Sequence, residues 1–305
     1  MVMIAVFPGQ GSQTPGFLSP WLSVDGAAER VSSYSEWAGV DLLAAGTEWD
    51  ADRIRDTQVA QPLIVAASLL SWHALADRSA VAGVAGHSVG EFAAAAAAGV
   101  LSDEDALRLV GIRGRAMAAA AAAEQTGMSA VIGGDQDAVV SRLEELGLTP
   151  ANYNGAGQIV AAGSLAGLQA LSAEPPQGTR VIPLQVAGAF HTDYMAPAVQ
   201  ALREAADAVQ PADPGVTLWS NRDGAPVESG AAFVAALVDQ VASPVRWDLC
   251  MDSFAEAGVT GIVELSPAGT LTGLAKRALR GVPSVAVKTP DDLPAAQTLL
   301  SGSQA

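Results

Sequence analysis

Short apolar runs alternate with longer amphipathic stretches along most of the chain. Two of the apolar runs, residues 3–7 and 81–85, each end at a glycine-rich turn, which is typical of buried strands. Apolar helices are expected over residues 63–75, where Pro62 would open the first turn, and over residues 91–98.

The longest amphipathic stretch begins at Ser102, whose hydroxyl is placed to cap a helix that runs to about residue 123. After His191 the alternation of helices and strands resumes. Further helices are expected over residues 193–209, 247–254 and 270–279, and further strands over residues 216–219, 261–265 and 284–287. From Asp291 onward, small and polar residues indicate a loose tail. This alternation predicts an α/β protein whose mainly parallel sheet is covered by helices on both faces.

Residues 127–187 follow a different pattern, in which two strand–helix–strand units come one after the other. Asp135 and Ser164 are each placed to cap a helix, and the second helix is expected to bury Leu165, Leu168 and Leu171 on one face. The resulting order, βαββαβ, is that of a ferredoxin-like α+β module. We therefore expect an inserted subdomain at 127–187 within a larger α/β domain made of residues 1–126 and 188–305.

Composition narrows the class of protein. The 305 residues are 50% hydrophobic and 16% charged, which excludes disorder for the bulk of the chain. A net charge of −16 repels phosphate backbones and anionic lipids, so we expect neither a nucleic-acid nor a membrane partner. The only cysteine, Cys250, cannot form an internal disulfide, and no basic residue precedes Arg30 as in a signal peptide. A cytoplasmic location is expected.

The pentapeptide Gly86-His87-Ser88-Val89-Gly90 fits the pattern G-x-S-x-G, between a predicted buried strand and a predicted helix. Glycines on both sides permit a strained turn that presents the serine hydroxyl, and the start of the helix directs N–H groups at a developing oxyanion. The pattern by itself is weak, but its placement favours Ser88 as a nucleophile.

A serine nucleophile needs a base, and the chain has three histidines. His87 adjoins Ser88 at a tight turn and cannot easily reach its proton, while His73 lies in an apolar helix as a candidate core residue. His191 follows the inserted module, where a loop can reach a cleft between the two units. Elimination therefore selects His191. Because no histidine follows it, the late-histidine layout of esterases is absent.

Two further features have open interpretations. The segment Phe7-Pro8-Gly9-Gln10-Gly11-Ser12-Gln13 lacks the lysine of a phosphate-binding loop, and it is either a simple turn or a place where backbone approaches Ser88. Arg113, inside an alanine-rich helix, is either a solvated surface residue or a clamp for a carboxylate.

In combination and in order, these motifs resemble the malonyl-CoA:acyl carrier protein transacylases of fatty-acid synthesis. The resemblance covers nearly the whole chain. Besides the two glycine-rich segments it rests on four more motifs, which are Ile112-Arg113-Gly114-Arg115, Asn152-Tyr153-Asn154, Gly188-Ala189-Phe190-His191, and Gln240 ahead of Ser243-Pro244-Val245-Arg246-Trp247.

The resemblance implies a hydrolase-like α/β domain with a ferredoxin-like insertion, and an acyltransferase that works by a ping-pong mechanism through a malonyl-serine. It implies Ser88 as nucleophile, His191 as base, the N–H groups of Gln10 and Val89 as oxyanion hole, and Arg113 as partner of the malonyl carboxylate. Malonyl-CoA would be a substrate, with no cofactor and no metal, and acyl carrier protein the partner.

The family orients its histidine through a backbone carbonyl, which corresponds to Gln240 here. Phe190 resembles the malonyl-selective form of its segment, and Gln61 and Asn154 correspond to pocket positions. The segment Gly188-Ala189-Phe190-His191 departs from the Pro-Ser-His form of many bacterial relatives, which makes the pocket details less secure than the nucleophile.

Lys276, Arg277 and Arg280 form a basic cluster at helical spacing. The cluster either helps to dock the anionic carrier protein or is an ordinary set of charges at a helix C-terminus. A serine hydrolase built on the same elbow and a non-catalytic carrier-binding protein are the alternative functions. The sequence leaves open whether the pathway served is fatty-acid synthesis, polyketide synthesis or malonate decarboxylation.

Overall fold

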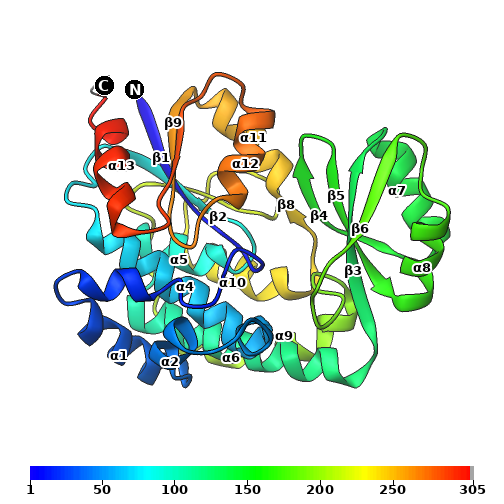
Figure 1. Cartoon of the computed structure of the whole chain (residues 1–305), viewed down its shortest axis with the longest axis horizontal. Helices are drawn as coiled ribbons and strands as arrows, with labels where there is room; N and C mark the ends of the chain where they lie inside the picture. The colour runs from blue at the N-terminus through cyan, green and yellow to red at the C-terminus, as the bar shows by residue number, and fades with distance from the viewer. Residues whose placement is uncertain (303–305) are drawn as a thin grey trace.

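The computed structural model describes residues 1–302 and contains two five-stranded sheets (Figure 1). The first has the strand order β10-β9-β1-β2-β7, and every neighbouring pair in it is parallel. Its strands are β1 (Val2–Phe7), β2 (Val81–Gly86), β7 (Thr217–Trp219), β9 (Val259–Glu264) and β10 (Ser284–Ala286). The predicted mainly parallel sheet is confirmed.

Helices cover both faces of this sheet, as the central strand β1 shows. Its residues Met3, Ala5 and Phe7 belong to one hydrophobic cluster, whereas Ile4 and Val6 belong to another on the opposite face. The α-helices outside the second sheet are α1 (Ala27–Ala38), α2 (Leu42–Thr47), α3 (Ala51–Arg55), α4 (Thr57–Ala74), α5 (Gly90–Ala97), α6 (Asp103–Ala123), α9 (Ala196–Ala206), α10 (Gly230–Asp239), α11 (Trp247–Glu256), α12 (Thr270–Ala278) and α13 (Leu293–Leu300). Short 3-10 helices occupy Ser19–Ser23, Asp193–Met195, Gln240–Ala242 and Pro290–Asp292.

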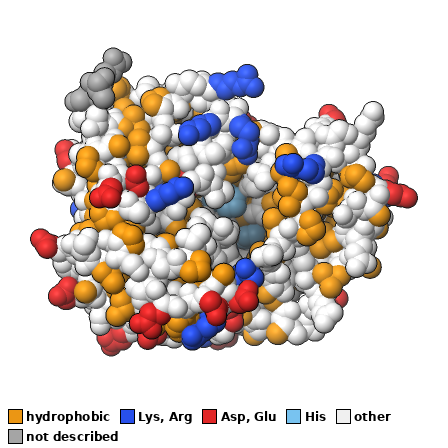
Figure 2. Space-filling view, viewed as in Figure 1, with side chains coloured by type: hydrophobic (Ala, Val, Ile, Leu, Met, Phe, Trp, Pro, Cys, Tyr) orange, Lys and Arg blue, Asp and Glu red, His pale blue; other side chains and the backbone are white. Residues whose placement is uncertain are grey.

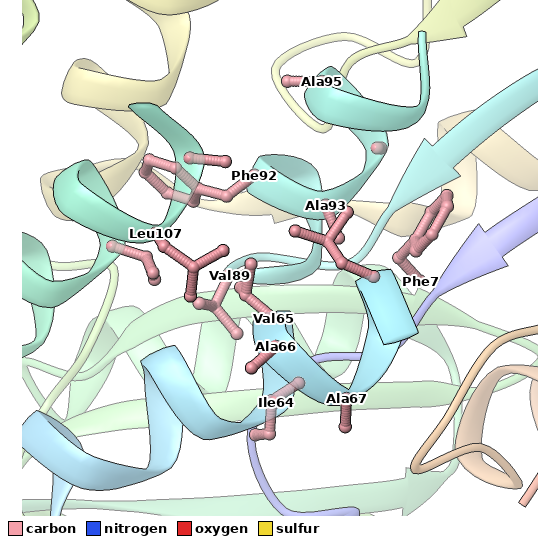
Figure 3. Packing of buried hydrophobic residues seen from close by; sticks show 14 of the residues in the cluster. Phe7, Ile64, Val65, Ala66, Ala67, Val89, Phe92, Ala93, Ala95 and Leu107 are labelled. Carbon is pink, nitrogen blue, oxygen red and sulfur yellow. The ribbon is translucent and has the colours of Figure 1, made fainter. Parts of the chain in front are cut away.

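Small side chains let the helices approach closely in the larger core. Phe7 of β1, Val65 of α4 and Phe92 of α5 pack there among alanines that are fully buried (Figure 3). A Cβ on Gly111 of α6 would lie 2.4 Å from the carbonyl oxygen of Ala38, so α1 packs directly on the backbone of α6. The alanine-rich composition therefore reflects close packing in this core rather than low complexity.

The second sheet has the order β6-β3-β5-β4-β8. Its elements are β3 (Thr126–Gly133), α7 (Gln136–Glu145), β4 (Thr149–Gly155), β5 (Gln158–Ser164), α8 (Leu165–Ala173), β6 (Thr179–Pro183) and β8 (Val245–Arg246). The first six follow the predicted βαββαβ order, and Asp135 and Ser164 cap the two helices as expected. The fifth strand, β8, comes from much later in the chain and pairs with β4 in parallel. The sheet is therefore not built from residues 127–187 alone.

Three local expectations are wrong. Helix α4 starts at Thr57, because the Asp56 side chain accepts the Gln58 N–H and caps it there, which leaves Pro62 inside the helix. Leu165 is exposed at the first position of α8. The expected loose tail forms α13, whose Ala296 and Leu300 are buried against the first sheet, so burial outweighs the polar composition.

Within residues 1–302, no helix combines the length and the apolar character that crossing a membrane would require. The charge-free segment over residues 57–76 instead belongs to α4, which is buried along most of its length.

Candidate active site

Ser88 lies at a tight turn between β2 and α5, with the left-handed φ of 52° that a strained elbow requires. Glycine is needed on both sides of this turn. A Cβ on Gly86 would lie 2.1 Å from the backbone carbon of Gly90, and a Cβ on Gly90 would lie 2.2 Å from the carbonyl oxygen of Phe7. Any other residue at either position would therefore force the backbone apart.

Asn221, which follows β7, holds the elbow from the neighbouring strand. Its Oδ1 accepts the Ser88 backbone N–H at 2.7 Å, and its Nδ2 donates to the Gly86 carbonyl at 2.8 Å. Asn221 is fully buried and was missed in the sequence. Its one sequence signal is its position after a predicted strand, at the sheet edge where the carboxyl ends of parallel strands meet.

His191 reaches Ser88 from the loop after β6. Its Nε2 lies 2.7 Å from Ser88 Oγ, and its Nδ1 lies 2.8 Å from the carbonyl oxygen of Gln240. A carbonyl only accepts, so Nδ1 carries the proton and Nε2 is free to accept from the serine hydroxyl. The structure thus brings Ser88, His191 and Gln240 together in the order required for base catalysis.

The electrostatic surroundings keep His191 neutral. Burial lowers the pKa of His191 most, and the nearby positive charge of Arg113 lowers it further, to about 3. The imidazole is therefore in the form that accepts a proton.

Two backbone N–H groups are positioned for an oxyanion. The Ser88 N–H is already bonded to Asn221, whereas in the described part of the chain the N–H groups of Val89 and Gln10 have no hydrogen-bond partner. Gln10 comes close because Gly9 packs against His87, where a Cβ would lie 2.9 Å from the His87 carbonyl oxygen. The segment after β1 is therefore a place of close backbone approach, not a simple turn.

Arg113 points into the same site from α6 and is only 1% exposed, which excludes the surface interpretation. Its Nη1 donates to Gln61 Oε1 at 2.7 Å and its Nη2 to Gln240 Oε1 at 3.1 Å, while its buried Nε has no partner among residues 1–302. Burial lowers the pKa of Arg113 to about 10, which leaves the guanidinium charged at neutral pH. The site thus contains a buried cation with a spare donor.

A cavity of about 190 Å³ joins these groups between the two sheets. Phe190, Asn154 and Gln61 line it together with Ser88 and Arg113. Figure 2 shows the hollow, with histidine visible inside it and basic side chains around its rim. The Asn154 Oδ1 lies 2.8 Å from His87 Nε2, so Asn154 contacts His87 rather than the Ser88–His191 pair.

The basic cluster of Lys276, Arg277 and Arg280 lies apart from these residues. All three side chains are exposed on α12 or just after it, and none forms an ion pair within residues 1–302. The first turn of the same helix, at Thr270 and Leu271, lines the cavity. The cluster therefore belongs to the surface next to the cavity, not to its interior.

Over the described residues, no group of three or more histidine, cysteine, aspartate or glutamate side chains is arranged to hold a metal ion. The chemistry that the geometry offers is attack by a base-activated serine on a carbonyl group, beside a cation suited to a carboxylate.

A family model described as an acyl transferase domain matches residues 4–292. The malonyl CoA-acyl carrier protein transacylase of Mycobacterium tuberculosis is 57% identical over 296 residues, which cover 95% of this chain and 98% of that protein. The protein of the same name from Bacillus subtilis is 34% identical, with 96% of each chain covered.

Solved structures agree with these matches. The crystal structure titled MCAT from Mycobacterium tuberculosis has a TM-score of 0.94 and 54% identity, and the match covers 97% of this chain and 100% of that one. A type II PKS acyl-carrier protein in complex with its malonyl-transacylase has a TM-score of 0.90 at 30% identity, with 99% of this chain and 100% of that chain covered.

The lowered pKa of His191 sets the acid limit of Ser88 reactivity. Because only neutral imidazole accepts the serine proton, labelling of Ser88 by phenylmethylsulfonyl fluoride should slow only well below pH 6.5, the ordinary histidine value. Arg113→Met removes one cause of the shift and should move this slowing to higher pH. Arg115→Met, which alters an arginine bonded to the Ala38 carbonyl instead, should leave the profile in place. Labelling rates followed by intact mass across an acidic pH series test this, and a profile that Arg113→Met does not move would contradict it.

Proposed function

This chain belongs to the acyl transferase family, in the group of malonyl CoA-acyl carrier protein transacylases, and we infer that it transfers malonyl from malonyl-CoA to acyl carrier protein. The observation that carries the proposal is one cavity that holds both the Ser88–His191 pair and the buried Arg113. The first suits acyl transfer through serine, and the second suits an acyl group that ends in a carboxylate.

The first half-reaction uses the Ser88–His191 hydrogen bond. Ser88 Oγ attacks the thioester carbonyl as its proton passes to His191 Nε2, and the oxygen that becomes negative meets the N–H groups of Val89 and Gln10. The carbon–sulfur bond then breaks, and the CoA thiolate leaves with the proton from His191. A malonyl ester on Ser88 remains.

The second half-reaction reverses these roles. His191 takes the proton of the phosphopantetheine thiol on the carrier protein, and the sulfur attacks the malonyl ester. The bond to Ser88 Oγ breaks, and the serine regains its proton from His191. One base therefore serves both halves, and no cofactor is needed because malonyl-CoA is the acyl donor.

Arg113 binds the malonyl carboxylate in this scheme. Gln61 and Gln240 hold the guanidinium with neutral amide oxygens, so it keeps its charge, and its unpartnered Nε supplies a further donor. A bound carboxylate also offsets the positive charge that lowers the pKa of His191. The correct substrate thereby strengthens the base that activates Ser88.

Other parts of the proposal concern the walls of the cavity and the setting of the protein. Phe190, adjacent to His191, is buried and would crowd an α-methyl branch on the acyl group. We propose that residues 127–187 act as a subdomain inserted between 1–126 and 188–305, since β3 and β5 supply one wall while Ser88 lies opposite. A cytoplasmic location fits the single, unpaired and buried Cys250.

The test of the proposed function is a covalent adduct on Ser88. Brief mixing with malonyl-CoA should add the mass of one malonyl group, and peptide mapping should place it on Ser88. Ser88→Ala should show no adduct, because no other nucleophile has His191 within reach. Adding carrier protein should discharge the adduct onto its phosphopantetheine thiol. Discharge to water at the same rate with and without carrier protein would indicate a hydrolase instead.

Arg113 should determine selectivity for the carboxylate. Arg113→Ala should lower kcat/KM for malonyl transfer by on the order of 10- to 100-fold, since hydrogen bonds to a charged partner are lost. Acetyl transfer, which lacks the carboxylate, should fall much less. Arg115→Ala is the matched control, because Arg115 lies on the same helix and bonds the Ala38 carbonyl. Equal losses for the malonyl and acetyl groups would refute the clamp.

The exposed basic cluster is proposed to dock the carrier protein. It lies on α12, whose first turn lines the cavity, so a partner held there could extend its phosphopantetheine arm toward Ser88. Unpaired cations at a rim mainly speed encounter with an anionic partner. A local cluster of this kind also lets a chain of net charge −16 recruit an acidic protein.

Reversing these charges should weaken the second half-reaction. The double variant Arg277→Glu and Arg280→Glu should raise the KM for carrier protein steeply at low salt, because attraction becomes repulsion, and the effect should shrink as salt is added. Arg142→Glu, on α7 and paired with Glu145, controls for a charge reversal elsewhere. Steady-state transfer rates over a carrier-protein series measure the effect, and an unchanged KM at low salt would exclude this docking surface.

A further inference from the structure

Glu91 is a buried carboxylate that the proposed acyl transfer does not use. It is the second residue of α5, three positions after Ser88, and it is 1% exposed. Each of its oxygens accepts a hydrogen bond from a different loop. Oε1 accepts the backbone N–H of Asn221 at 2.6 Å, and Oε2 accepts from the side-chain Nε2 of Gln240.

These two loops carry the supports of the reacting pair. Asn221 binds the Ser88 N–H and the Gly86 carbonyl, and the backbone carbonyl of Gln240 binds His191. We propose that Glu91 is a positioning residue that holds the nucleophile elbow and the histidine loop in register. The proposal rests on the proposed function only in taking Ser88 as nucleophile and His191 as its base.

The same carboxylate fixes which way the Gln240 amide faces. With its Nε2 directed at Glu91, Gln240 presents Oε1 to Arg113 at 3.1 Å. A neutral amide thus stands between the carboxylate and the guanidinium, so the two buried charges attract each other without forming a direct ion pair. Burial raises the pKa of Glu91, and the Asn221 N–H and the charge of Arg113 oppose that rise.

The isosteric change Glu91→Gln exposes the constraint. If the oxygen of the substituted side chain takes the Asn221 N–H, its new amide group faces the Gln240 amide group, donor against donor. Turning Gln240 around relieves that contact but then directs its amide N–H groups at Arg113. No arrangement of a glutamine at this position satisfies all the donors, and in a buried network an unmatched donor displaces its neighbours.

A second substitution restores the match. In Glu91→Gln combined with Gln240→Glu, the amide at position 91 donates to the new carboxylate, which also accepts from Arg113, and Asn221 keeps its acceptor. The backbone carbonyl that binds His191 is unchanged in this pair of substitutions. Recovery in the double variant therefore separates positioning through this network from a general need for glutamate at position 91.

The experiment measures the reactivity of Ser88 without any malonyl substrate. Phenylmethylsulfonyl fluoride labels an activated serine, and intact mass gives the rate even if the transfer reaction proves to be different. Glu91→Gln should slow labelling on the order of 10- to 100-fold, because the serine and histidine lose alignment. The double variant should recover most of that loss.

Asp103→Asn is the matched control. Asp103 is a partly buried carboxylate with two side-chain partners, Tyr34 and His73, and it begins α6 about 15 Å along the helix from Arg113. Its substitution should lower the melting temperature and leave the labelling rate unchanged. Melting temperatures of all variants show whether each is folded at the temperature of the assay.

Two results would overturn the proposal. One is labelling of folded Glu91→Gln at the wild-type rate, and the other is a folded double variant no faster than the single one. Should Glu91→Gln fail to fold, Asn221→Ala replaces it, since it removes both elbow contacts and keeps the backbone N–H that Glu91 accepts. This variant should also label slowly, and labelling at the wild-type rate would equally contradict the proposal.

Discussion

The contact between Gly90 and the carbonyl of Phe7 is the constraint on which the site depends. The two main strands β1 and β2 run parallel and end together, and α5 starts so close to them that a Cβ at position 90 would overlap the Phe7 oxygen. This packing turns the chain sharply at Ser88 and places the Val89 N–H beside the segment that carries Gln10. The nucleophile and both proposed oxyanion donors therefore follow from one close approach of backbone.

Electrostatics within the cavity follow from how the buried charges are balanced. Arg113 and Glu91 are each about 1% exposed, and charges so buried are costly unless they are hydrogen-bonded and compensated. Here the Gln240 amide connects the two, so Arg113 is compensated yet remains available to an incoming carboxylate. The same positive charge depresses the pKa of His191. Binding of an anionic substrate and activation of the base are thus linked through a single residue.

Local patterns predicted most of the fold because they report local energies. The helix caps at Ser102, Asp135 and Ser164 form as expected, since a cap depends on residues within one turn. The failures arise where distant packing decides. Helix α13 exists because Ala296 and Leu300 find a hydrophobic surface on the first sheet, which composition alone does not reveal.

The candidate site divides along the same line. Ser88, His191 and Arg113 could be proposed from residue type, motif context and elimination, because each carries distinctive chemistry. Asn221 could not, since its role arises only when β7 lies beside β2, 133 positions away from Ser88 in sequence. Glu91 stood in plain view after the serine motif, but a carboxylate at that position has no meaning until the partners of both its oxygens are known. The general lesson is that reactive groups can be read from sequence, whereas the groups that align them become visible only in the folded chain.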